Sequence, residues 1–135
     1  MALFSWNDSF SVNVSEIDLQ HKKLVNLLNE LSDAMKLGKG NDKVGNILNE
    51  LTAYAVAHFK TEEKYFVMYK FPEADSHIEE HTDFVQKVTD FKKEFENGTR
   101  SLTVEVLDFL CDWLQKHIMG SDKNYSSFFN EKGLR

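Results

Sequence analysis

The feature that most constrains this chain is a spacing of apolar residues three and four positions apart, which recurs in four long stretches. Such spacing places the apolar side chains on one face of an α-helix. The stretches run from Ile17 to Met35, from Val44 to Phe66, from His77 to Phe95 and from Val106 to His117. The single proline, Pro72, falls between the second and third stretches, where it ends a helix without interrupting one. The pattern therefore predicts an all-α protein.

Short connections between four amphipathic helices favour an up-down-up-down antiparallel four-helix bundle. The first fifteen residues are predicted to form an irregular N-terminal arm, and residues 122–130 a short C-terminal helical tail. Ser15 and Asp18 have the spacing of a capping box, which would start the first helix. The chain has 135 residues, of which 41% are hydrophobic, so residues 1–135 are expected to form a single domain around one core.

Six polar residues lie on the apolar stripes, at positions where a bundle would carry leucine. They are the five histidines of the chain and one glutamate, namely His21, His58, Glu62, His77, His81 and His117. A buried carboxylate is costly unless it is paired or bound to a metal ion, and an unpartnered imidazole carries a smaller cost of the same kind. These positions therefore indicate that the bundle encloses something that the polar side chains bind.

The spacing of these residues favours shared ligation. His58 and Glu62 are four positions apart, as are His77 and His81, so each pair stands one turn apart on a single helix face. Such a pair can reach one metal ion or two adjacent ions.

His117 and Asp122 are five positions apart, which on a continuous helix points them about 140° away from each other. Gly120 lies between them and can end the helix. We therefore expect the chain to turn at Gly120 and to bring Asp122 back toward the centre.

An antiparallel bundle brings to one level the start of the first helix, the end of the second, the start of the third and the end of the fourth. Seven candidate ligands fall there: His21, His58, Glu62, His77, His81, His117 and Asp122. Seven ligands are too many for one tetrahedral ion and suit two six-coordinate ions bridged by carboxylates.

Each fragment of this pattern also has a simpler interpretation. A lone histidine such as His21 is more often a buried histidine with a hydrogen-bond partner, and Asp122 alone is typical of a helix N-cap. Cys111 lies six residues before His117, about 120° around the helix, and is interpreted as a packing residue. A bundle without metal would leave five histidines buried and unpartnered, so we discard that alternative.

The complete set resembles the signature of the hemerythrin family, and specifically its bacterial group. Further segments agree with the family, namely Trp6, Ile17-Asp18-Leu19-Gln20-His21, Trp113-Leu114-Gln115-Lys116-His117-Ile118 and Asp122-x-x-Tyr125. The resemblance extends over nearly the whole chain.

This resemblance implies two iron ions per chain, bound without haem and bridged by an oxo or hydroxo group. It implies that His77, His81 and His117 ligate one iron, that His21 and His58 ligate the other, and that Glu62 and Asp122 bridge both. Three imidazoles with the three bridging oxygens fill six positions on the first iron, whereas two imidazoles leave the second iron one open position. Gln20, Glu50 or backbone carbonyls are candidates to orient the imidazoles from outside.

The function implied is reversible binding of O2, as a carrier or store, rather than enzymatic catalysis. Leu114 lies three residues before His117, so we expect it to pack over the oxygen pocket and to gate it, with Ile118 and Trp113 as further pocket residues. Apolar walls would keep out the bulk water that assists irreversible oxidation of iron.

Three other functions are known for di-iron sites in helical bundles. Di-iron oxidases and ferroxidases carry Glu-x-x-His spacing and four or more carboxylates, whereas this chain offers five histidines and two carboxylates. An oxygen or redox sensor domain would use the same site, but the chain contains no linker, coiled coil or output domain, which favours a free-standing carrier. An iron store or a nitric-oxide scavenger would also use it, and no residue decides against these.

Composition limits the partners and the compartment. The formal charge of −6 argues against nucleic acid and anionic membrane surfaces as partners, and no apolar run is long enough for membrane insertion. The N-terminus lacks the features of a signal peptide, and the single cysteine rules out an intramolecular disulfide. We expect a cytoplasmic monomer whose partner is O2, with an oxygen-consuming enzyme as a further candidate.

Overall fold

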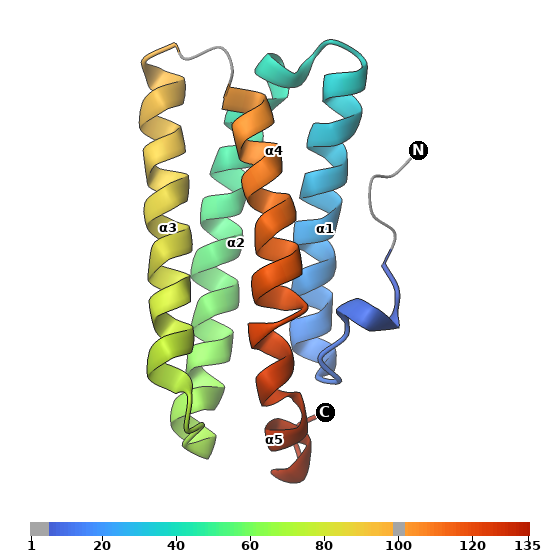
Figure 1. The fold of residues 1–135 in the computed structure, drawn as a ribbon, viewed down its shortest axis with the longest axis vertical. Helices are drawn as coiled ribbons and strands as arrows, with labels where there is room; N and C mark the ends of the chain where they lie inside the picture. The colour runs from blue at the N-terminus through green and yellow to red at the C-terminus, as the bar shows by residue number, and fades with distance from the viewer. Residues whose placement is uncertain (1–5, 99–101) are drawn as a thin grey trace.

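Four long helical segments run alternately up and down in the computed structural model of the chain, which describes residues 6–98 and 102–135 (Figure 1). The helices are α1 (Ser15–Lys36), α2 (Gly40–Tyr69), α3 (Ala74–Glu96) and α4 (Leu102–Trp113). Four shorter helical elements are η1 (Asp8–Phe10), η2 (Leu114–Ile118), η3 (Ser121–Tyr125) and α5 (Ser126–Glu131). No strand occurs within the described ranges, so the predictions of an all-α protein and an antiparallel four-helix bundle are confirmed.

Tight turns connect the helices. Gly38, with φ +72°, follows the end of α1, and Lys70, with φ +56°, ends α2 in the left-handed conformation. Pro72 follows within two residues and cannot continue a helix. These short connections make sequential helices antiparallel neighbours, as predicted.

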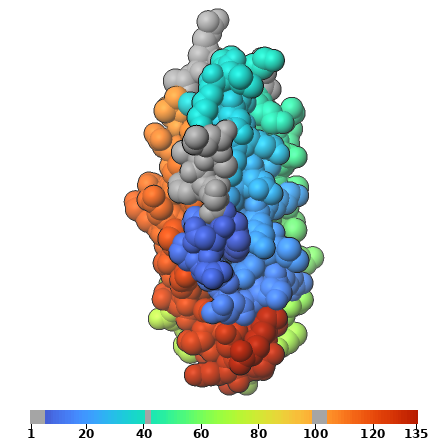
Figure 2. Space-filling view, turned by 90° about the vertical axis from the view of Figure 1, so that its right-hand side faces the viewer, coloured from blue at the N-terminus to red at the C-terminus, as the bar shows by residue number. Residues whose placement is uncertain are grey.

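The arm before α1 is held by hydrogen bonds that the sequence did not suggest. Asp18 Oδ2 accepts from Ser11 Oγ at 2.6 Å, and Asp18 Oδ1 accepts from the backbone N–H of Val12 at 2.9 Å. Ser15 is already the first helical residue, and the N-cap residue, Val14, makes no side-chain cap. The predicted capping box is therefore wrong, because Asp18 binds the arm instead. Figure 2 shows this arm, in dark blue, lying beside α1 and above the C-terminal segment.

Two apolar clusters divide the core. The main cluster contains Leu24, Leu28, Tyr54, Phe59, Phe84, Leu110, Trp113, Leu114, Ile118 and their buried apolar neighbours. The end cluster contains Val12, Val14, Ile17, Phe66, Phe71, Tyr125 and Phe129. Along α1, His21 falls between a residue of the end cluster and one of the main cluster, and the same holds for Glu62 on α2. The polar residues therefore form a layer between two apolar regions.

Within the part of the chain that the structure describes, no helix is long and apolar enough to cross a membrane.

Candidate metal centre

The polar layer brings together all seven side chains that the sequence selected. They are His21, His58, Glu62, His77, His81, His117 and Asp122, each at most 3% exposed. They come from α1, α2 and α3, from η2, which directly follows α4, and from η3.

Their ligand atoms fall into two groups, and within each group all atoms lie within 4.8 Å of one another. One group consists of Glu62, His77, His81, His117 and Asp122, and the other of His21, His58, Glu62 and Asp122. The two carboxylates belong to both groups. The arrangement therefore offers two adjacent positions for metal ions with the carboxylates between them.

Asp122 shows this shared position most directly. Its Oδ1 lies 2.8 Å from His77 Nε2 and 2.9 Å from His117 Nε2, while its Oδ2 lies 3.0 Å from His21 Nε2. One oxygen thus faces the three-histidine group and the other faces the two-histidine group.

Glu62 lies against both groups as well. Its Oε1 is 3.0 Å from His81 Nε2 and 3.2 Å from His58 Nε2. Its Oε2 accepts a hydrogen bond from the hydroxyl of Tyr125, which is fully buried in the end cluster. Tyr125 therefore holds one oxygen of Glu62 and leaves the other directed into the polar layer.

Several of these atoms are close together without being hydrogen-bonded. No described atom serves as hydrogen-bond partner to the Nε2 atoms of His77, His81 and His117, to Glu62 Oε1 or to either oxygen of Asp122. Buried polar atoms are normally satisfied, and lone pairs that converge in this way suit a cation. Five imidazoles with two carboxylates form a donor set suited to first-row transition metals such as iron.

Two glutamates hold histidine rings from outside. His81 Nδ1 lies 3.1 Å from Glu63 Oε2, and His117 Nδ1 lies 3.0 Å from Glu80 Oε1, which also accepts a hydrogen bond from Ser121 Oγ at 2.7 Å. A carboxylate at Nδ1 fixes the proton there and leaves the Nε2 lone pair free for a metal ion. Sequence reasoning missed both glutamates, because each acts across helices and no spacing within one helix marks it.

His58 has a neutral partner instead. Its Nδ1 lies 2.6 Å from Gln20 Oε1, and the amide of Gln20 in turn donates to Thr61 Oγ1 at 3.1 Å. Gln20 was among the expected orienting residues and has this position, whereas Glu50 is exposed on α2.

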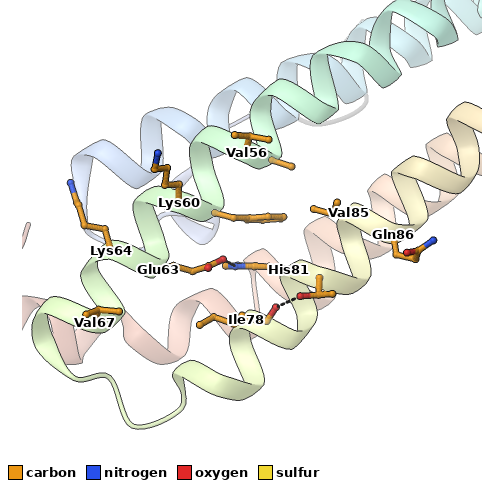
Figure 3. A pocket seen from close by; sticks show the side chains of 12 residues that line it. Val56, Lys60, Glu63, Lys64, Val67, Ile78, His81, Val85 and Gln86 are labelled. Atoms are coloured by element: carbon orange, nitrogen blue, oxygen red, sulfur yellow. Dashed lines mark hydrogen bonds and ion pairs between the residues drawn. The ribbon is translucent and has the colours of Figure 1, made fainter.

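Aromatic rings cover the outer histidines. Phe59 stacks on His81 with ring centroids 3.8 Å apart, and Trp113 stacks on His117 at 3.9 Å. Trp113, predicted as a pocket residue, therefore lies against the three-histidine group. Figure 3 shows Glu63 of α2 and His81 of α3 pointing toward each other. Both residues line a groove of about 800 Å³.

The remaining predicted pocket residues, Leu114 and Ile118, are fully buried in the main cluster. Both lie within η2, the element that also carries His117.

The chain around His117 follows a π-helix, which the sequence analysis did not predict. In a π-helix the backbone hydrogen bonds span five residues instead of four. At the end of η2, Met119 N accordingly donates to Leu114 O, five residues back, at 3.0 Å. Gly120 then separates η2 from η3, where Asp122 lies. The predicted turn at Gly120 is confirmed, and the π-helix precedes it. Such π-turns inside helices are frequent at functional sites.

Electrostatics in the layer favour ionised carboxylates. Burial raises the pKa of Asp122, but the charge of His117 lowers it by more. The pKa of Asp122 therefore lies well below its ordinary value. Burial likewise raises the pKa of Glu62, but the neighbouring His58 outweighs this effect. The pKa of Glu62 therefore also lies below its ordinary value. Burial and the charges of Asp122 and Glu62 raise the pKa of Tyr125, which keeps its hydroxyl protonated as a donor.

Comparisons with known proteins agree with this geometry. The family model described as "Hemerythrin HHE cation binding domain" matches residues 12–128. Bacteriohemerythrin of Clostridium acetobutylicum is 32% identical over 127 residues, covering 91% of this chain and 98% of its own. A hemerythrin-like protein of Naegleria gruberi is 35% identical, with 90% of each chain covered. The crystal structure of a wild-type hemerythrin superposes with a TM-score of 0.83 at 32% identity, covering 93% of this chain and 97% of that one.

Proposed function

The chain belongs to the hemerythrin family, and from this premise we propose that it binds O2 reversibly, as a carrier or store, at a pair of non-haem iron ions. The observation that carries the proposal is the pair of buried donor groups that share Glu62 and Asp122. One metal ion would require neither two groups nor shared carboxylates.

The proposal assigns each ligand to one iron or to both. His77, His81 and His117 would hold one iron, His21 and His58 the other, and Glu62 and Asp122 would bridge them together with an oxo or hydroxo group. The irons, when bound, supply the electrons that reversible O2 binding requires. The unequal number of histidines supports an open position on the side of His21 and His58.

The residues of the chain supply positioning and exclusion of water. The outer partners Gln20, Glu63 and Glu80 orient histidine rings, so that the Nε2 lone pairs face the polar layer. Leu114 and Ile118 belong to the apolar cluster that covers this layer, and we propose that they line the ligand pocket with Trp113 at its edge. An apolar cover slows the loss of electrons from iron to solvent.

Binding without catalysis is part of the same proposal, since relatives of this family are named as hemerythrins rather than as enzymes. We also propose that residues 1–135 act as one domain, as a monomer in the cytoplasm. Support comes from Cys111, whose thiol is free and partly buried, as expected in a reducing compartment. An oxygen-consuming enzyme would be the recipient of a carrier.

An optical titration of the anaerobically reduced protein, with iron counted per chain, tests the function. Two irons per chain with a visible charge-transfer band that appears with O2 and disappears under vacuum would support a reversible carrier. Two irons that oxidise at once without releasing O2 would contradict it and favour a sensor or a scavenger of nitric oxide. A protein that retains no iron would contradict the metal site itself.

A further inference from the structure

Tyr54 is a buried residue of α2 that the proposed ligand set does not use. It is 3% exposed and lies four residues before His58, so the two side chains stand one turn apart on the same face of α2. Their rings are nearly parallel, with an interplanar angle of 15° and centroids 5.1 Å apart. Tyr54 therefore extends into the bundle alongside a proposed iron ligand.

The hydroxyl of Tyr54 has no hydrogen-bond partner among the described residues. Besides His58, the rings that pack on the Tyr54 ring are apolar: Phe59 and Phe84 lie edge-on to it at centroid distances of 6.4 and 6.5 Å. A buried hydroxyl without a partner is costly, and a phenylalanine would fill the same space without that cost. The position of this hydroxyl therefore calls for a partner that the described side chains do not provide.

The neighbour of the ring indicates where that partner would lie. Tyr54 packs on His58 from the same face of α2. His58 Nε2 lies 3.1 Å from His21 Nε2, so Tyr54 stands beside the two-histidine group.

The apolar residues described in the main cluster offer few donors. Among the buried residues of the main cluster, only Tyr54 and Trp113 carry a nitrogen or oxygen donor in the side chain. Trp113 stacks on His117 and so belongs to the three-histidine side. The side chains of Leu24 and Leu114 are fully buried and carry no hydrogen-bond donor.

We propose that the hydroxyl of Tyr54 donates a hydrogen bond to the anionic ligand that occupies the open position beside His21 and His58. This inference rests on the proposed function. It makes Tyr54 a specificity-determining residue, because a phenol in an apolar pocket stabilises a ligand that bears negative charge more than a neutral one. Small monoanions with a terminal acceptor atom are the ligand class it selects.

Azide, a small monoanion, serves as the probe. The iron-loaded ferric forms of the wild type, Tyr54→Phe and Tyr69→Phe are titrated with azide, and the charge-transfer band of the adduct gives the Kd. Tyr69→Phe is the matched control, because it removes a phenol hydroxyl from the far end of the same helix, where the ring packs on Tyr65 and Phe129. We expect Tyr54→Phe to bind azide about tenfold more weakly and Tyr69→Phe to match the wild type.

Two further readings separate the hydrogen bond from a structural role. Iron content should stay at two per chain in Tyr54→Phe, and the metal-free variant should melt no lower than the metal-free wild type, because only an unpartnered hydroxyl is lost. An equal azide Kd in the wild type and Tyr54→Phe overturns the inference and leaves the proposed function intact.

The other outcomes are equally distinct. A visible band in the ligand-free protein that disappears in Tyr54→Phe would mean that the phenolate itself ligates iron, which overturns the donor role. An iron-loaded wild type that shows no azide adduct would overturn the proposed function, and this inference with it.

Discussion

At the scale of single residues, the two groups of the candidate centre differ in what orients their histidines. His81 and His117 face carboxylates of Glu63 and Glu80, whereas His58 faces the neutral amide of Gln20. A carboxylate at Nδ1 increases the basicity of Nε2 more than an amide does. The three-histidine group is therefore the more electron-rich donor set of the two.

Removing one of these carboxylates should weaken the metal site. In Glu80→Ala, His117 loses its partner at Nδ1 and Ser121 loses an acceptor. We expect metal affinity to fall about 10- to 100-fold, measured as competition with a chelator of known affinity. Glu79→Ala is the matched control, because Glu79 is the adjacent and exposed residue. Equal affinity in the two variants would remove Glu80 from the positioning role.

Leu114 permits a second test at this scale. The side chain is fully buried in the main cluster, three residues before His117. Leu114→Ala should widen the pocket, admit water and speed autoxidation several-fold, measured as decay of the oxygenated band. Leu110→Ala, one turn earlier on α4, is the control for a buried cavity of the same size, since both variants lose about 2–5 kcal/mol of stability. Unchanged decay in Leu114→Ala would exclude the gate.

Six of the seven candidate ligands could be predicted because each repeats the helical spacing of its own element, and Asp122 could be predicted because Gly120 ends the helix before it. Their outer partners could not, because Glu63 reaches His81 across a helix interface, and nothing in the sequence specifies how two helices are rotated against each other. Tyr54 was hidden for a different reason. A tyrosine on an apolar stripe is typical of a core, and only its unpartnered hydroxyl distinguishes it.

At the scale of elements, the apolar stripes sufficed to predict the four helices and the glycine-containing turns. The π-helix of η2 could not be predicted from the sequence, because a single π-turn does not alter the apolar spacing of the residues before it. The predicted capping box failed because Asp18 had a competing partner in the arm.

Substitution of Gly120 tests whether the turn between η2 and η3 positions Asp122. A Cβ atom built there would lie 2.5 Å from the backbone oxygen of Lys116, a contact that neither atom can relieve without moving the chain. Gly120→Ala should therefore displace Asp122 and lower the iron content below two per chain. Gly38→Ala is the control, because its φ of +72° makes it strained while its surroundings are open. Gly38→Ala should lower the free energy of unfolding by about 1 kcal/mol and retain both irons.

At the scale of the whole molecule, the polar layer makes the stability of the metal-free bundle depend on pH. Burial lowers the pKa of His117, but the charge of Asp122, with contributions from Glu62 and Glu80, raises it more, from an ordinary 6.5 to about 9. A group whose pKa is raised by folding adds stability that is complete below its unfolded pKa and is lost as the pH rises through its folded pKa. The lowered pKa values of Asp122 and Glu62 act in the opposite direction, because their contribution is lost as the pH falls below about 4.5.

The metal-free protein should accordingly be most stable between about pH 4.5 and 6.5. Between pH 6.5 and 9 its free energy of unfolding should fall by up to about 3 kcal/mol, measured by urea denaturation after chelation. The iron-loaded protein is the comparison, because metal ions displace these protons and should abolish the decline. A flat profile for the metal-free protein above pH 6.5 would contradict the coupling of His117 to the carboxylates.

The position of Asp122 also has a consequence for biosynthesis. This residue follows all four long helices in the chain, and both donor groups include it. During translation neither metal position can be complete until η3 has left the ribosome, so a nascent chain offers incoming iron only partial sites. Metal loading would therefore follow the synthesis of all four long helices.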